Sequence, residues 1–120
     1  MAKYFTRDEF KCKCGKCVNM IQDEFIEQMD SLREKYGKPI FVNSGYRCPA
    51  HNNEVSSTGF NGPHTTGRAG DFKIDRGDAV HLLELALAIP YFKGFGVNQK
   101  GLGRFLHLDA SRDTRTIWSY

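Results

Sequence analysis

The sequence predicts an α+β domain in which two helices pack on a mainly antiparallel sheet. Apolar residues recur at helical spacing in two segments, about residues 18–36 and 78–88. Four short segments have the β-branched or aromatic residues and the nearby glycines of strands: 40–43, 71–75, 94–98 and 104–109. A glycine-bearing loop separates the last two strands, which we expect to form a hairpin.

The sequence contains end signals for both helices, but the two helices differ in their apolar patterns. The first carries one apolar stripe opposite a charged face, and Gly37 followed by a proline stops it. The second is N-capped by Asp75 or Asp78 and ended by Pro90. Its apolar residues cover more than half of its surface, so we expect it to be well buried, with His81 in a structural role.

The bulk composition indicates one ordinary globular domain over residues 1–120. No apolar run approaches the roughly 18 residues of a membrane-spanning helix. The net charge of +3 favours anionic surfaces such as a bacterial wall but is too small for a nucleic-acid-binding surface. Residues 1–6 lack the pattern of a secretory signal, so we expect synthesis in the cytoplasm without membrane insertion.

Two imidazoles and a carboxylate carry the predicted chemistry. His64 lies in a loop without apolar periodicity, and Asp71 begins an alternating strand. In segment 104–109 the strand period of two places His107 and Asp109 on the same face. Two histidines and one aspartate are a ligand set of catalytic zinc, which keeps a further position open for water. The sequence therefore predicts a small zinc hydrolase.

The four cysteines form a separate candidate site. Cys12, Cys14 and Cys17 stand close together, and Cys48 lies far along the chain. The spacing of Cys14 and Cys17 is that of a zinc knuckle, although Cys12 is nearer than in the usual paired knuckles. The thiols could hold a structural metal, stay free and reduced, or form two disulfides, and the lack of an export signal argues against oxidation. We expect the cluster to concern the scaffold and not catalysis.

Arg47 follows the first strand in the run Ser44-Gly45-Tyr46-Arg47. Its forked guanidinium could reach over a cleft and suits a substrate carboxylate or a developing oxyanion. The local sequence alone nevertheless favours an exposed loop arginine.

The motifs in combination resemble one known family. The run 44–47 is followed by His64 and Asp71 with Gly-x-Ala between them, then by His107-x-Asp109 and a late Trp118. This order resembles the zinc D-alanyl-D-alanine carboxypeptidase family. That family includes D-alanyl-D-alanine dipeptidases and phage endolysin peptidases, and its metal core is similar to the hedgehog signalling domain. The resemblance covers nearly the whole chain.

The resemblance implies that His64, Asp71 and His107 bind zinc and that Arg47 binds or polarises the scissile carbonyl. It implies a fold of the hedgehog or D-Ala-D-Ala peptidase type and a substrate in the stem peptides of bacterial peptidoglycan. We expect a monomer that acts on the cell wall, encoded by a phage or prophage and reaching the wall after phage-mediated release.

Two positions depart from the family pattern. Many members carry an acidic general base three residues before the last zinc-binding histidine, where this chain has Arg104, which cannot accept a proton. Asp109 is the best replacement, either as the base or as a group that orients an imidazole. Gly62 replaces a serine that often stands two residues before the first histidine. The alternatives are a catalytically silent, zinc-stabilised module that binds the wall, or an interaction domain built on thiol-bound zinc.

Overall fold

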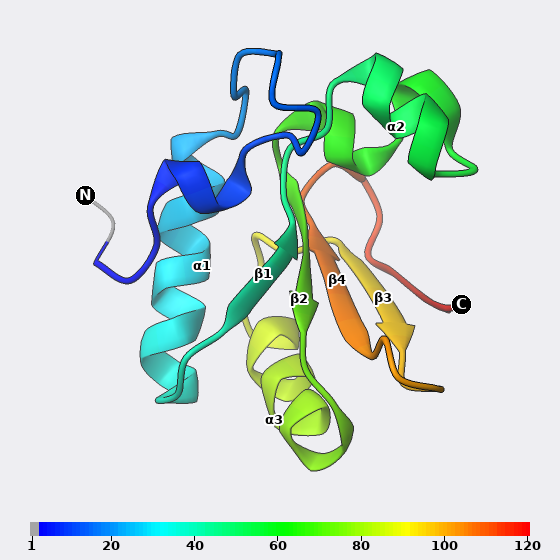
Figure 1. Cartoon of the computed structure of the whole chain (residues 1–120). Helices are drawn as coiled ribbons and strands as arrows, with labels where there is room; N and C mark the ends of the chain where they lie inside the picture. Colours follow the sequence, from blue (N-terminus) through cyan, green and yellow to red (C-terminus); the bar gives the residue numbers. More distant parts are fainter. Residues whose placement is uncertain (1–2) are drawn as a thin grey trace.

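The computed structural model describes residues 3–120 and has the α+β architecture that the sequence predicts (Figure 1). Met1 and Ala2 lie outside the described residues. They belong to the N-terminal segment that we expect to lack a secretory signal. The helices are α1 (Asp23–Tyr36), α2 (Pro49–Val55) and α3 (Arg76–Leu87), with 3-10 turns η1 (Arg7–Phe10), η2 (Gly59–Asn61) and η3 (Pro63–Thr66). The strands are β1 (Phe41–Ser44), β2 (Ala69–Lys73), β3 (Gly94–Asn98), β4 (Phe105–Asp109) and β5 (Thr116–Ser119). Within residues 3–120, no helix is both long enough and apolar enough to cross a membrane.

The sheet has the strand order β1-β2-β4-β3-β5, and only the β3–β5 pair is parallel. The predicted hairpin of β3 and β4 is confirmed. β2 and β4 pair along their whole length, with Asp71 directly opposite His107 and Ala69 opposite Asp109. The register of these two inner strands therefore decides which polar side chains meet.

The two faces of the sheet have different roles. Phe72, Leu106 and Leu108 are fully or almost fully buried in the hydrophobic core, against which α1 and α3 pack (Figure 1). Their neighbours Asp71 and His107 point to the other face, where their side chains meet. The predicted alternation in these strands is confirmed, because successive side chains of a strand point to opposite faces.

Helix α1 begins at Asp23, later than the predicted start near residue 18. The preceding segment is held outside the helix by hydrogen bonds from distant parts of the chain. Arg7 donates to the carbonyls of Asn19 and Ile21, and the N–H of Gln22 donates to the Gly67 carbonyl at 2.8 Å. Tertiary contacts therefore override the apolar spacing, although Ile21 is still buried.

Helix α3 is less buried than its composition predicts. Only Ala79, Leu82 and Ala86 are buried, whereas Val80 is 58% exposed and Leu87 is 41% exposed. The expectation of a well-buried helix is wrong, because a helix that packs on one side of a sheet can bury only one stripe. His81 lies on the exposed side with its ring 5.6 Å from that of Tyr36.

The strand β5 is not among the four strands that the sequence predicts. Thr116–Ser119 extends the sheet by pairing with β3 in parallel. Three of its four residues are exposed, so the segment shows no alternation between buried and polar positions.

The segment before α1 packs closely on the segment after β1. The N–H of Tyr46 donates to the Phe10 carbonyl at 2.8 Å. A Cβ atom at Gly45 would lie 2.6 Å from the Phe10 backbone, closer than real Cβ atoms approach. Gly45 therefore permits a close backbone approach that no larger residue allows.

We expect Gly45→Ala to lower the free energy of unfolding by about 1–3 kcal/mol, because the added methyl group meets backbone that cannot rotate away. Urea unfolding measures the change. The matched control is Gly103→Ala, where a Cβ meets nothing within 4 Å. A change within about 0.5 kcal/mol at both positions would contradict the close approach.

Candidate metal centre

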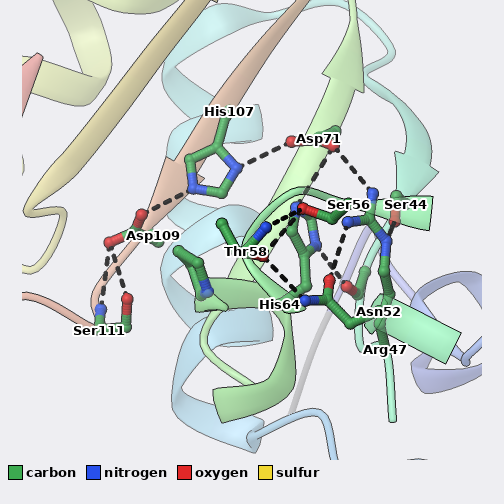
Figure 2. Close-up of polar contacts among 12 residues, drawn as sticks. Ser44, Arg47, Asn52, Ser56, Thr58, His64, Asp71, His107, Asp109 and Ser111 are labelled. Carbon is green, nitrogen blue, oxygen red and sulfur yellow. Dashed lines mark hydrogen bonds and ion pairs between the residues drawn. The ribbon is translucent and has the colours of Figure 1, made fainter. Parts of the chain in front are cut away.

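Three predicted metal ligands from three different elements converge on one point (Figure 2). His64 comes from η3, Asp71 from β2 and His107 from β4. Their donor atoms lie within 4.8 Å of one another. The two oxygens of Asp71 are divided between the histidines, at 3.3 Å from His64 Nε2 and 2.9 Å from His107 Nδ1. The three residues form a possible metal site.

The orientation of His64 is fixed by a backbone carbonyl. Its Nδ1 lies 2.8 Å from the oxygen of Gly45. A carbonyl only accepts hydrogen bonds, so Nδ1 carries the proton and Nε2 keeps a lone pair. That lone pair is directed toward Asp71. The ring is thus held in the tautomer that a metal ligand requires.

His107 lies between two carboxylates, with Asp71 on one side and Asp109 on the other (Figure 2). Its Nε2 donates to Asp109 Oδ2 at 2.7 Å, which leaves Nδ1 to face Asp71. Asp109 is fully buried and also accepts from the backbone N–H and hydroxyl of Ser111 and from Arg112 Nε. Burial alone would raise the pKa of Asp109, but the hydrogen bond and charge of His107, with Arg112, lower it on balance.

None of the three ligand side chains carries a permanent positive charge. An ionised carboxylate only accepts hydrogen bonds. A proton or a metal ion must therefore lie between Asp71 and each imidazole nitrogen that faces it. Burial raises the pKa of Asp71, but the hydrogen bonds and charges of His107 and His64 bring it well below its usual range. Burial lowers the pKa of His107, and its two carboxylate partners raise it overall. A divalent cation among the three donors satisfies every one of them, and two nitrogens with one oxygen suit zinc.

Two glycines on β3 make room for this site. Gly94 pairs with Asp109 and Gly96 with His107. A Cβ at Gly94 would collide with the Asp109 carboxylate, and one at Gly96 would lie 2.9 Å from both His107 and Trp118. Gly96 therefore lets the Trp118 ring pack on His107, with the ring centroids 5.2 Å apart. Sequence reasoning missed this role, although glycines inside a strand often signal the close approach of another group.

Arg47 lies beside the ligands and is not an exposed loop residue. Only 17% of its side chain is exposed, and Nη2 lies 3.5 Å from Asp71 Oδ2. Its Nε donates to Ser44 Oγ and its Nη1 to Asn52 Oδ1, both at 3.2 Å. The local sequence interpretation of this arginine is wrong, because the fold brings Asp71 of β2, which is far away in the sequence, next to its guanidinium.

Asn52 was not singled out by the sequence. It is fully buried, and while its oxygen accepts from Arg47, its Nδ2 donates to Thr58 Oγ1 at 2.9 Å. A Cβ at Gly62 would lie 2.8 Å from Asn52 Nδ2 and would collide with Thr58. The glycine that replaces the family's serine thus leaves space for the pair that supports Arg47. No local pattern distinguishes such an asparagine from one in an ordinary turn.

A groove of about 380 Å³ opens beside the ligands, and its walls include Arg47, His51, Asp71 and Phe105. Arg104 does not reach it. The Nε of Arg104 donates to the Gly101 carbonyl at 3.0 Å, and its side chain lines a larger cavity of about 570 Å³ beyond the C-terminal end of β2. The larger cavity contains none of the three metal ligands.

The four cysteines are all free and converge separately from these ligands. The disulfide alternative is therefore absent from this structure.

Comparison with known proteins identifies the family. A search of curated proteins gave no match. Residues 3–109 match the family model described as peptidase M15, and this segment contains His64, Asp71, His107 and Arg47 but not β5. Members of this family are zinc-dependent metallopeptidases. The chain belongs to the peptidase M15 family, the family of the zinc D-alanyl-D-alanine carboxypeptidases.

Proposed function

We propose that this chain is a monomeric zinc peptidase that hydrolyses peptide bonds in the stem peptides of bacterial peptidoglycan. One observation carries the proposal: the donors of His64, Asp71 and His107 converge at a groove where Arg47 lies 3.5 Å from Asp71. Amide hydrolysis needs an activated water and a fixed positive group at the developing oxyanion. Membership of the peptidase M15 family supports a peptide substrate.

The residues of the chain have distinct parts in this chemistry. Zinc, when bound by His64, Asp71 and His107, supplies a Lewis acid that activates water and polarises a carbonyl. Gly45 holds His64 in its ligand tautomer through the 2.8 Å contact with Nδ1. Ser44 and Asn52 hold Arg47 through Nε and Nη1, so Nη2, which lies beside Asp71, is the nitrogen placed to bind the substrate carbonyl or carboxylate.

We assign Asp109 the orienting role and not that of the general base. The imidazole of His107 separates the Asp109 carboxylate from Asp71, and the carboxylate is already bonded to His107, Ser111 and Arg112. A carboxylate that accepts from the outer N–H of a metal-binding histidine fixes its ring and raises its basicity.

A second candidate function follows from the walls of the groove. Among its lining residues, the only carboxylate is that of Asp71 and the only imidazole is that of His51. A proton acceptor must therefore be His51 or come from outside the groove walls. The alternative function is a catalytically silent, zinc-stabilised module that binds the wall, and turnover separates it from the peptidase.

We propose a lysin of phage or prophage origin that is released to the wall. Exo-attack on a terminal D-alanine yields the free amino acid, whereas endo-attack yields larger peptides. Product analysis by mass spectrometry distinguishes the two modes, and loss of turbidity of permeabilised cells tests the lysin role.

The purified chain should cleave peptidoglycan stem peptides only when zinc is bound. We expect chelation to abolish release of new amines, zinc to restore it, and His64→Ala to bind less zinc at this site and to be inactive. The control is His81→Gln, which changes an exposed histidine on α3 that belongs neither to the ligand set nor to the groove. Zinc bound through His64 without any cleavage would favour the silent module.

Asp109→Asn should weaken zinc binding at this site by about 10- to 100-fold, because the outer partner of His107 loses its charge. A competition titration with a chromogenic chelator measures the affinity, and excess zinc should restore much of the turnover. Asp113→Asn, at an exposed position, is the matched control. Unchanged zinc affinity with lost turnover would instead make Asp109 the base.

Arg47→Ala should reduce kcat by about 100- to 1,000-fold while zinc stays bound, because one donor to the oxyanion is lost. Steady-state kinetics on a defined stem peptide measures the change. Arg104→Ala removes a guanidinium that faces the other cavity and should leave kcat nearly unchanged. Equal effects of the two variants would contradict the assignment.

A further inference from the structure

The thiol cluster joins two segments that are far apart in sequence. Cys12, Cys14 and Cys17 lie in the loop between η1 and α1, and Cys48 is the residue that caps the start of α2. All four sulfurs lie within 4.8 Å of one another. None of the peptidase ligands belongs to this group, so the cluster needs its own explanation.

The distances between the sulfurs are those of ligands around one ion. The Sγ atoms are 3.5 Å apart for Cys14 and Cys17, 3.8 Å for Cys12 and Cys48, and 3.9 Å for Cys14 and Cys48. A covalent disulfide needs about 2.05 Å. Four sulfurs at about 2.3 Å from a tetrahedral zinc ion are about 3.8 Å from one another.

The backbone around the sulfurs is arranged to support negative charge on them. Gly15 has a φ of 71°, which curls the loop between Cys14 and Cys17. The N–H of Lys16 points at the sulfur of Cys14, and the N–H of Cys48 points at that of Cys12, both at 3.4 Å. Hydrogen bonds to thiolates favour the charged form, which is the form that binds metals.

We propose that Cys12, Cys14, Cys17 and Cys48 bind a second zinc ion with a structural role. Four thiolates fill a tetrahedral ion completely, so no position remains for water or substrate. The exposed Cys17 gives the ion a path from solvent, while the buried Cys12 anchors the cluster to the core. This site does not depend on the proposed peptidase activity.

The proposed ion would fasten the N-terminal loop to the segment that carries Arg47. Cys48 directly follows Arg47, and α2 carries the Asn52 that bonds to it. The Phe10 carbonyl, two residues before Cys12, accepts from Tyr46. A structural ion here therefore stabilises the fold at the side of the groove where Arg47 lies, and its loss lowers thermal stability.

Metal analysis of the whole chain tests the site. We expect about two zinc ions per chain in the wild type, about one in Cys17→Ser and about one in His64→Ala. Lys16→Ser, which keeps the backbone N–H and changes no ligand, is the control and should keep both ions. Cobalt substitution supplies the signature, because an intense thiolate-to-cobalt absorption should appear in His64→Ala and weaken in Cys17→Ser.

The wild type provides a test that needs no variant. Titration with a mercurial reagent that blocks thiols should release one zinc ion and leave the second bound. Free thiols without a second metal, an oxidised pair, or cobalt absorption that is equal in Cys17→Ser and the wild type would each overturn the proposal. These readouts are independent of cleavage, so an inactive protein with two zinc ions would refute the peptidase while supporting this site.

Discussion

The pairing of β2 with β4 is the constraint on which the candidate metal centre depends. This ladder sets Asp71 opposite His107 on one face and buries Phe72, Leu106 and Leu108 on the other. The apolar burial that stabilises the sheet therefore also fixes two of the three donors, because the strand period couples the faces. The third donor, His64, lies on the turn immediately before β2, and the carbonyl of Gly45 sets its tautomer.

The buried charges around His107 add an energetic requirement to this geometric one. His107 is buried between two carboxylates, an arrangement that is favourable only when positive charge resides among them. Metal binding and folding of this region are thus expected to be coupled. The coupling reaches β5, because Arg112 contacts Asp109 and stacks over Trp118, whose ring packs on His107.

The sequence predicted those features that have a local signal. Strand alternation placed His107 and Asp109 on one face, and the fold class and the β3–β4 hairpin were also predicted correctly. The prediction failed where contacts with residues far away in the sequence determine the structure. Examples are the start of α1, the exposed half of α3 and β5, which lacks an apolar pattern. Asn52 and the paired glycines Gly94 and Gly96 escaped notice because their importance lies in what approaches them, which no neighbouring residue reveals.

The opposition of Asp71 and His107 across one ladder also bears on how such a protein can diversify. The chain between them contains α3, β3 and the turn before β4, none of which sets the distance between the two donors. Insertions in that turn can therefore reshape the neighbouring cavity, which Leu102 and Arg104 line, while the donors stay in place, as surface loops tolerate added length. Deleting one residue inside β2 or β4 would instead displace a donor, because its side chain would then point into the apolar core. The length of the chain can thus vary in this turn, whereas the two strands are held to a fixed length.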